Sequence, residues 1–428
     1  MFEGGFEGLI FFFTERIMSS RRKFIKTASL FAGGSISLLN SGFTKRELID
    51  FEKATNDDEL FEMVRKQLLI PNKMIYLNTG SLGPSPLEVI DGMHATTRQL
   101  ESNPVGENWG PLGNQMELVR KKVADFIHAD VDEIVLTRNT TEGLNLIAQS
   151  LQLNEGDEII TTTLEHGGGE VGLDFLVKTK GAVLKKIELP LPGNTVAEIV
   201  ETIERNITPK TKLLMLSHVN TITGMLMPFA EIAKITRPKG IYLIADGAQA
   251  PGLVNVDVKA LGVDAYSASG HKWLMGPKET GFLFIRKEFQ ELAQPVFTFS
   301  GLTAYSASSG TRNVSTIIGL GLALDFHNRI GTDKIQQRTL QQRNYCLAEL
   351  KKLKGLKIIS PESSALSTGI VSFSLDTVKN SEIFTKMKER DIIVKLLSQH
   401  NAIRISCHMF VSKKDIDTFI KELKTLLS

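Results

Sequence analysis

Short apolar runs alternate with amphipathic stretches through the middle of the chain, and this alternation limits the fold more than any other feature. Apolar runs bounded by turn residues are typical of strands, whereas apolar residues at every third or fourth position are typical of helices. The expected strands are 133–137, 158–162, 183–187, 212–217, 241–245, 265–267 and 281–285, and the helices between them include 141–151, 196–207 and 229–236. Strands that alternate with helices predict an α/β fold with a mostly parallel seven-stranded sheet and helices on both faces.

The segments on either side of this region have a different pattern. Residues 47–69, 89–100 and 115–127 predict helices before the first strand of the sheet. From residue 317 onward helical stretches dominate, with two short strands at 369–373 and 402–406 and a last helix at 414–427, which predicts a smaller α+β domain. The expected divisions are an N-terminal extension (1–46), a segment that packs on the small domain (47–88), a large domain (89–312) and the small domain (313–428).

The composition of the chain limits the kinds of ligand and macromolecular partner that we expect the protein to bind. A net charge of +2 over 428 residues gives no reason to expect nucleic acid or a membrane surface as a partner. The two cysteines, Cys346 and Cys407, lack the spacing of a zinc site and allow at most one disulfide, so we expect no metal and two unpaired structural thiols.

The N-terminus resembles a twin-arginine (Tat) export signal. Arg21 and Arg22 are followed by Phe-Ile-Lys and then by a mildly apolar run over 27–39 that is too short and too rich in Gly and Ser for a membrane span. The expected location is therefore the periplasm, reached through the Tat translocon, or the cytoplasm if the signal does not function. Met18 is an alternative start, and no clear cleavage site follows the apolar run.

The chemistry is concentrated around Lys272. This lysine lies between a Ser-Gly-His turn and a Gly-Pro turn, an arrangement that suits an enzyme holding an aldehyde cofactor covalently on a lysine. Ser269 and His271 could donate hydrogen bonds to a phosphate group. A lysine taken alone is more often a solvated surface charge, so the interpretation depends on its neighbours.

Asp246 and Gln249 precede this segment. Asp246 follows an apolar strand, and ligands of open α/β sheets gather at the carboxyl ends of strands. A carboxylate there can keep a pyridine nitrogen protonated, and Gln249 could bind the phenolic oxygen of the ring. The alternative is that Asp246 only caps the turn after its strand.

Two further segments offer polar groups at strand ends. Thr140 and Thr141 begin a predicted helix, where free backbone N–H groups favour an anion such as a phosphate, although an ordinary threonine cap is the alternative. His166 follows another strand and could stack on a cofactor ring, or it could be a loop histidine without a special role. Arg404, on a predicted strand of the small domain, could hold a carboxylate or could be a surface arginine.

Together these segments resemble the class V group of fold-type I enzymes that depend on pyridoxal 5'-phosphate (PLP). That group includes cysteine desulfurases, serine–glyoxylate-type aminotransferases, kynureninase and isopenicillin N epimerase-like proteins. The resemblance covers the chain from about Met74 onward, and the motifs Ser-Gly-His-Lys-Trp-x-x-Gly-Pro and Asp-Gly-Ala-Gln carry most of it.

The resemblance implies the fold of the PLP-dependent transferases and a role for each candidate residue. The implied catalytic residues are Lys272 as the Schiff-base lysine, Asp246 as the pyridinium partner and His166 as the stacking residue. The implied cofactor ligands are Thr140, Thr141, Gln249, Ser269, His271 and Thr311. The implied substrate-binding residues are Arg404, Asn78 and Thr221. The segment around Thr311 resembles one that a neighbouring subunit lends to the phosphate. A homodimer with a shared active site is therefore implied.

Two departures from the desulfurase pattern shape the expected function. Desulfurases carry a cysteine on a mobile loop upstream of the carboxylate-binding arginine, but residues 393–401 contain none, and Cys407 lies beyond Arg404. Thr221 stands where desulfurases have asparagine, which fits the epimerase-like branch better. The export signal is similar to that of periplasmic enzymes that tailor siderophores.

The expected activity is therefore PLP-dependent chemistry on an amino acid or another amine. Lys272 would take the α-proton as general base, and the negative charge would spread into the ring. We expect an aminotransferase or an epimerase-like enzyme first, and a lyase related to cysteine or selenocysteine lyases, or a siderophore-tailoring enzyme, as the alternative. A cofactor-free binding protein is disfavoured because Lys272 and Asp246 are both present. The sequence leaves the substrate open.

Overall fold

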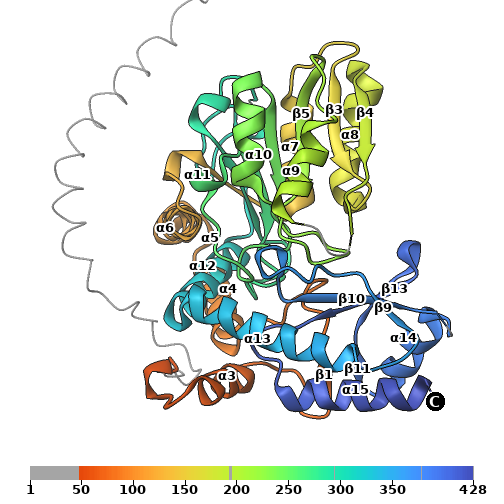
Figure 1. Ribbon diagram of the computed structural model, residues 1–428. Coiled ribbons are helices and arrows are strands. Elements are labelled where there is room, and N and C mark those ends of the chain that lie inside the picture. Colours follow the sequence, from red (N-terminus) through yellow and green to blue (C-terminus); the bar gives the residue numbers. More distant parts are fainter. Residues whose placement is uncertain (1–47, 192–194, 294, 377, 428) are drawn as a thin grey trace, which may run out of the picture. The chain divides into compact units, whose positions relative to one another are not determined.

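The computed structural model describes residues 48–427 except 192–194, 294 and 377 (Figure 1). The predicted export signal, including Arg21 and Arg22, lies outside the described residues. Residues Leu48–Ser428 form one compact unit. Among the residues that are described, no helix combines the length and apolarity needed to cross a membrane.

The centre of the large domain is a seven-stranded sheet in the order β2-β8-β7-β6-β5-β3-β4. Its strands are β2 (Ile134–Thr137), β3 (Glu158–Thr162), β4 (Val183–Ile187), β5 (Thr211–Ser217), β6 (Tyr242–Asp246), β7 (Ala265–Ser269) and β8 (Gly281–Ile285). Only β8 runs antiparallel to its neighbours β2 and β7, whereas the other pairs are parallel. The predicted fold class, a mostly parallel seven-stranded sheet with a smaller α+β domain, is confirmed.

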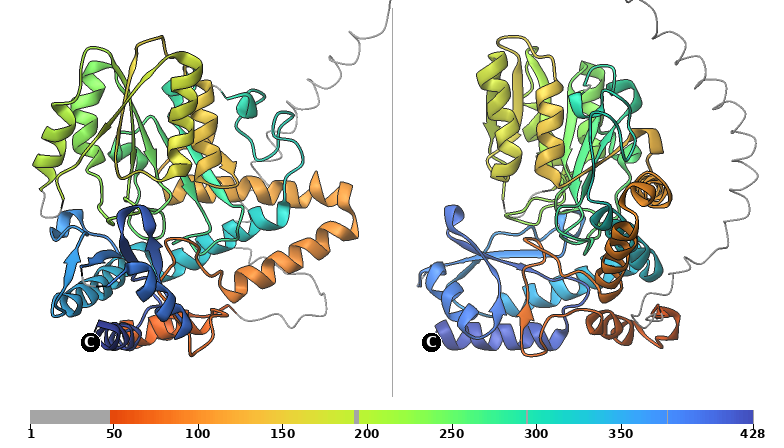
Figure 2. Two further views of the ribbon diagram at one scale, coloured as in Figure 1. Left: turned by 90° about the vertical axis from the view of Figure 1, so that its right-hand side faces the viewer. Right: turned by 180° about the vertical axis from the view of Figure 1, so that it is seen from behind.

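Both faces of this sheet are covered by helices (Figures 1 and 2). Side chains alternate along each strand, so Ile134 and Leu136 enter one apolar cluster while Val135 enters another. The first cluster includes side chains of α9 (Val196–Glu204) and α10 (Phe229–Thr236), and the second those of α7 (Thr140–Ser150) and α8 (Gly167–Lys180). Strands buried on both faces explain why these segments are almost continuously apolar.

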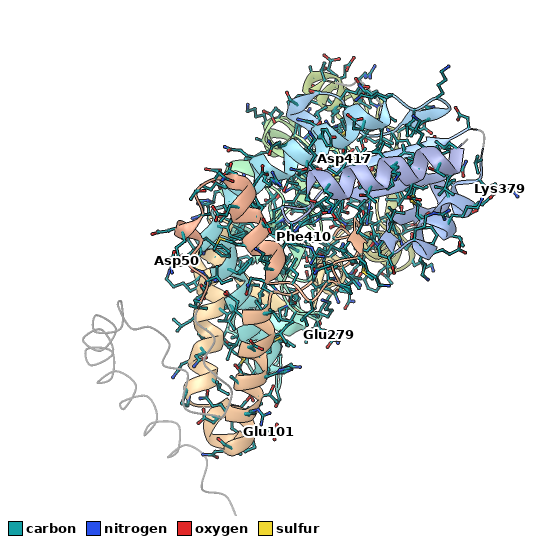
Figure 3. All side chains as sticks on the ribbon, turned by 90° about the horizontal axis from the view of Figure 1, so that it is seen from below. Asp50, Glu101, Glu279, Lys379, Phe410 and Asp417 are labelled. Carbon is teal, nitrogen blue, oxygen red and sulfur yellow. The ribbon has the colours of Figure 1, made fainter. Side chains whose placement is uncertain are left out.

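Three long helices connect the large domain to the small one. They are α4 (Leu87–Ser102), α6 (Pro111–Phe126) and α12 (Val314–Ile330), and α12 packs against the other two. Figure 3 shows α4 and α6 running side by side toward the tip at Glu101. Ion pairs from Lys122 to Asp325 (2.5 Å) and from Arg329 to Glu88 (2.6 Å) join the three helices at their surface.

The small domain is built on an antiparallel four-stranded sheet in the order β12-β13-β10-β9. Its elements are β9 (Leu356–Ile358), β10 (Ile370–Leu375), β12 (Lys395–Leu397), β13 (Ala402–Ser406), α13 (Thr332–Leu350), α14 (Asn380–Glu389) and α15 (Lys413–Leu427). In Figure 3, α15 carries Asp417 and runs from the side of Phe410 toward Lys379. The predicted domain boundaries stay predictions, because residues 48–428 cluster as one unit.

The N-terminal segment packs on the core of the small domain. Its helix α3 (Asp57–Lys66) buries Phe61 and Val64 in that core, and the short strand β1 (Ile75–Tyr76) pairs in parallel with β11 (Ile392–Ile393). The single helix expected over 47–69 is wrong. A 3-10 helix (Phe51–Lys53) is separated from α3 because the side chain of Asn56 accepts a hydrogen bond from the Glu59 N–H and starts a new helix.

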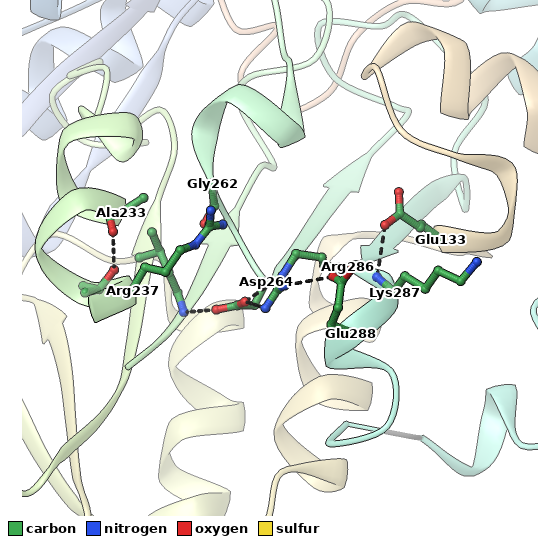
Figure 4. Close-up of polar contacts among 10 residues, drawn as sticks. Glu133, Ala233, Arg237, Gly262, Asp264, Arg286, Lys287 and Glu288 are labelled. Atoms are coloured by element: carbon green, nitrogen blue, oxygen red, sulfur yellow. Dashed lines mark hydrogen bonds and ion pairs between the residues drawn. The ribbon is translucent and has the colours of Figure 1, made fainter. Parts of the chain in front are cut away.

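The amino ends of β6 and β7 are tied together by one buried carboxylate (Figure 4). Asp264 accepts hydrogen bonds from the Leu243 N–H (2.8 Å) and from Arg286 Nη2 (2.6 Å). Nearby, the Lys287 N–H donates to Glu133 (3.0 Å). These contacts fix the amino ends of the strands. The predicted site lies at the other end of the sheet, at the carboxyl ends of the same strands.

Candidate active site

The carboxyl ends of three adjacent strands bring the predicted groups together. Ser217 ends β5 and pairs in register with Asp246, which ends β6 and pairs with Ser267 of β7. Asp246 is 7% exposed, and one of its oxygens accepts a hydrogen bond from the Ala248 N–H (2.9 Å). Burial raises the pKa of Asp246, while that N–H and the charge on Lys272 act in the opposite direction. The aspartate therefore caps its turn and also lies, buried, near a lysine.

Lys272 lies in the turn after β7 and is half-buried. Burial lowers its pKa to about 8, the charge of Asp246 opposes that shift, and the charge of Arg404 adds to it. Its neutral amine form, which an amine needs in order to attack a carbonyl or accept a proton, is therefore more populated near neutral pH than in a solvated lysine.

A segment from the N-terminal side supports the lysine turn. The Gly83 N–H donates to the His271 carbonyl (2.7 Å), and Lys278 Nζ donates to the Gly83 carbonyl (2.9 Å). A Cβ atom on Gly83 would lie 1.9 Å from the Lys272 carbonyl oxygen, so only glycine fits there. Sequence reasoning missed this contact. The Gly-Pro turn at 83–84 was its only local signal.

Three of the predicted phosphate ligands lie around the start of α7, and His271 follows in the turn after β7. Ser269 Oγ accepts a hydrogen bond from the Thr140 N–H (3.0 Å) and lies 2.7 Å from Thr140 Oγ1. Thr141 follows in the first turn of α7. His271 Nδ1 is buried without a hydrogen-bond partner, and burial lowers the pKa of this histidine to about 4. Thr311 is exposed in the loop before α12 and forms no hydrogen bond with the others in the described part of the chain.

His166 caps helix α8 with its ring. Its Nδ1 accepts a hydrogen bond from the Gly168 N–H (3.0 Å), so the second ring nitrogen carries the proton when the imidazole is neutral. The side chain is exposed, yet partial burial of the ring and then the charge on Lys272 lower its pKa, against the opposing charge of Asp246. The imidazole therefore lies within electrostatic reach of the lysine and the aspartate.

Arg404 occupies an interior strand of the small sheet and is 2% exposed, so the interpretation as a surface arginine is wrong. Nη1 donates to the carbonyl (3.0 Å) and the hydroxyl (2.7 Å) of Thr221, and Nη2 donates to Ser81 Oγ (3.1 Å) and Asn78 Oδ1 (3.3 Å). Nε has no partner, and no carboxylate in the described chain pairs with this guanidinium. Burial lowers its pKa to about 10.

Gln249 connects the two halves of the site. The indole N–H of Trp273 donates to Gln249 Oε1 (2.7 Å), and Gln249 Nε2 donates to the Gly80 carbonyl (2.8 Å) and to Thr221 Oγ1 (3.1 Å). Thr221 therefore accepts from both Gln249 and Arg404. The expected bond from Gln249 to a phenolic oxygen stays a prediction. Trp273, which orients the amide, was missed although it directly follows the lysine.

Sequence reasoning also missed Glu165, which directly precedes His166. Thr162 Oγ1 donates to one carboxyl oxygen (2.6 Å), and Ser217 Oγ donates to the other. Burial raises the pKa of Glu165 to about 7, those two hydroxyl donors lower it, and the charge of Asp246 raises it further. Its position next to a site histidine, in Thr-Leu-Glu-His, was the only signal available in the sequence.

The residues present fit a flat cofactor that carries an anionic group and a basic ring nitrogen. The start of α7 offers hydroxyl and N–H donors, while Asp246 offers a buried carboxylate for a protonated nitrogen. Glycines keep this region open. A Cβ on Gly169 would lie 3.3 Å from Asp246 Oδ2, and one on Gly168 would lie 2.6 Å from Thr141 Oγ1. The arrangement fits PLP, and the roles predicted for the individual residues, Gln249 and Thr311 among them, stay predictions.

The fold and these residues define a PLP-dependent enzyme of fold type I. The aminotransferase class-V family matches residues 75–419, and the chain belongs to that family. A probable cysteine desulfurase of Halalkalibacterium halodurans is 31% identical over 383 residues, which cover 82% of this chain and 92% of the relative.

Two solved structures of the protein C-DES have a TM-score of 0.76 and 25% identity to this chain. One is a lysine-to-alanine variant with glycine covalently linked to the PLP cofactor, and it covers 84% of this chain and 98% of its own. The other is described as the cystine C-S lyase C-DES in complex with its product, cysteine persulfide, and covers 82% and 98%. The prediction of PLP dependence is confirmed. These relatives support the lyase alternative better than the aminotransferase or epimerase that we placed first.

Proposed function

We propose that this protein is a PLP-dependent lyase that cleaves a carbon–sulfur or carbon–selenium bond in a cysteine-type amino acid. The observation that carries the proposal is the guanidinium of Arg404, buried without a carboxylate partner in the described chain and close enough to Lys272 to lower its pKa. A buried cation of this kind calls for an anion, and the α-carboxylate of an amino acid is suited to bidentate binding by arginine. The names of the relatives point to sulfur-containing amino acids.

The cysteines favour a lyase over a desulfurase that uses a protein thiol. Cys346 and Cys407, the only two in the sequence, are fully buried in the core of the small domain. The neighbouring thiol of Cys407, and then burial, raise the pKa of Cys346 well above its usual value, and a protonated thiol is a poor nucleophile. Sulfur would therefore leave with the product or pass to an external acceptor.

The side chains have distinct roles in this reaction. Arg404 binds the α-carboxylate, while Thr221, Asn78 and Ser81 orient its guanidinium. Bound PLP would supply an electron sink for the charge that develops on the α-carbon. Lys272 takes the α-proton in its neutral form, and Asp246 provides the negative charge that holds a protonated ring nitrogen. Loss of the sulfur substituent from the β-carbon completes the elimination.

The test is to follow PLP-loaded protein with cystine in deuterated water by NMR. For cystine plus water, elimination gives one cysteine persulfide, one pyruvate and one ammonia. Lys272→Ala should abolish these products and the near-visible absorbance of the loaded protein, whereas Lys357→Ala, at an exposed lysine of β9, should retain the absorbance. Alanine as the main product, a requirement for an added keto acid, or isotope exchange without pyruvate would each overturn the proposal.

A homodimer is the proposed assembly. The loop that leads to Thr311 exposes large apolar side chains, with Val296 at 84% and Phe299 at 74% exposure. Tyr305 of the same loop forms an edge-on ring contact with the half-exposed Trp109. Exposed apolar clusters of this kind support a protein partner, and a second copy would give Thr311 access to a neighbouring site. Val296→Glu with Phe299→Glu should yield monomers with weaker PLP binding, as measured by light scattering and absorbance. A native protein that is monomeric at all concentrations would refute the dimer.

Export through the Tat pathway is proposed from the N-terminal sequence alone. The pair Arg21-Arg22, the Phe-Ile-Lys that follows and the apolar run over 27–39 support it. Replacing both arginines with lysine should leave the protein in the cytoplasm of a host with a Tat system, as judged by cell fractionation. Unchanged export of the variant would refute this location.

A further inference from the structure

A second cation lies on the strand next to Arg404. Strand β12 pairs antiparallel with β13, and Lys395 is directly opposite Arg404. Directly opposed residues of an antiparallel pair project from the same face of the sheet, with Cβ atoms about 4.5–5.5 Å apart. Because the Arg404 side chain reaches Thr221 and Asn78 in the site, Lys395 starts from the same face as the carboxylate-binding group.

The charge of Lys395 reaches the site. The pKa of His166 is lowered first by burial and then by Lys272, and Arg404 and Lys395 act in the same direction. Lys395 is exposed and forms no ion pair or hydrogen bond with any described residue. Its ammonium is therefore accessible to a ligand on the face of the sheet that also carries Arg404, on a flexible stem.

The balance of charges leaves this lysine without a partner inside the site. Lys272, Arg404 and Lys395 all act on His166, and Asp246 is the one carboxylate among the described groups acting on it. The α-carboxylate of a substrate would occupy Arg404, and the charge of Asp246 already acts on Lys272. A second anion on the substrate would find Lys395 exposed, without an ion pair to any described residue, on the strand next to Arg404.

We infer that Lys395 binds a second acidic group of the substrate, so that the preferred substrate is an amino acid whose sulfur substituent ends in a carboxylate. The inference rests on the proposed carbon–sulfur lyase activity and names the substrate class of that site. Cystine belongs to this class because its leaving half carries its own carboxylate. S-methylcysteine has the same reacting atoms without the distal acid.

The test compares Lys395→Met and Lys395→Glu with the matched control Lys357→Met. Lys357 is also exposed on a short edge strand, β9, but on the opposite edge of the small sheet. We expect Lys395→Met to lower kcat/KM for cystine about fivefold to tenfold, within the range of a partly screened ion pair, and to leave S-methylcysteine unchanged. Lys395→Glu should lower the value for cystine further, whereas Lys357→Met should change neither substrate.

A binding measurement separates this inference from the proposed activity. 3,3'-Dithiodipropionate has the two acids and the disulfide of cystine but no amine, and 3-(methylthio)propionate has one acid. Calorimetry on the PLP-loaded protein should show tighter binding of the diacid, and Lys395→Met should remove that difference. Equal effects of Lys395→Met on both ligands or both substrates, or none on either, overturn the inference. If neither substrate is cleaved, the lyase proposal fails while the binding result still decides the role of Lys395.

Discussion

The two halves of the active site are built in different ways. On the cofactor side, the groups come from strand ends and the turns that follow them, so Asp246 is held by the backbone two residues on, at Ala248. On the carboxylate side, Arg404 contacts Thr221, Ser81 and Asn78, which are 183, 323 and 326 residues away in the sequence. The comparison shows that the chemistry of the cofactor is placed by local structure, whereas substrate binding depends on the packing of distant segments.

The two halves also differ in electrostatic balance. Asp246 and Lys272 carry opposite charges, and each moves the pKa of the other in the direction that favours its charged form. Arg404 is buried with neutral acceptors only and lacks a carboxylate partner in the described chain. An unpaired buried charge lowers the stability of the folded protein. We therefore expect the carboxylate side to be destabilised until an anion binds, whereas the charges on the cofactor side already offset each other.

Replacing Arg404 with methionine is the strongest test of this difference between the two halves of the site. We expect about a 10²- to 10³-fold rise in KM for the amino acid substrate, because its carboxylate loses a buried charged partner. We also expect the free energy of unfolding to rise by about 1–3 kcal/mol, because a buried, unpaired cation is removed. Steady-state kinetics and urea denaturation measure the two effects. A variant that loses several kcal/mol of stability would show that Arg404 is structural.

The next largest effect concerns the contact between the N-terminal segment and the lysine turn. Gly83→Ala should destabilise the protein by about 3 kcal/mol, because a Cβ atom would overlap the Lys272 carbonyl. Gly167→Ala is the matched control. Nothing lies within 4 Å of its added Cβ, and its helical position should tolerate alanine within about 0.5 kcal/mol. Similar denaturation midpoints for the two variants would contradict the close packing at Gly83.

The sequence predicted the parts that local structure places, on the cofactor side, better than the parts that depend on packing between distant segments. The strands of the large sheet were predictable because they are apolar runs buried on both faces, and the rule of carboxyl strand ends placed Asp246 near Lys272. The two-residue strand β11 carries too little pattern to be recognised, whereas β1 lies within a short strand that the apolar run over 74–77 predicts. The burial of Arg404 and the clamp of Trp273 on Gln249 depend on tertiary packing, which no local pattern contains.

A third prediction concerns acid stability beneath the lysine turn. His327 is fully buried, and burial lowers its pKa to about 4 against the opposing effect of the nearby backbone of Leu274 and Trp273. Because the folded state binds this proton less tightly than the unfolded chain, with its ordinary pKa near 6.5, stability is lost as the pH falls from about 6.5 toward 4. His327→Phe should remove about 2 kcal/mol of the stability difference between pH 7.5 and pH 5. An unchanged pH dependence in urea titrations would rule out this origin.

The smallest expected effect has the opposite sign and tests the cofactor side. The pKa of Glu165 is raised by burial to about 7, so the folded state holds this proton more tightly than the unfolded chain. The resulting stabilisation is present below the unfolded pKa near 4.5 and is lost as the pH rises toward 7. Glu165→Gln keeps the hydrogen-bond acceptor for Ser217 and should abolish a loss of stability of about 1.7 kcal/mol that Glu165 causes between pH 5 and 6.5. If the pH dependence is unchanged in the variant, Glu165 is ionised in the folded state throughout that range, and Asp246 is not the only negative charge available to a protonated ring nitrogen.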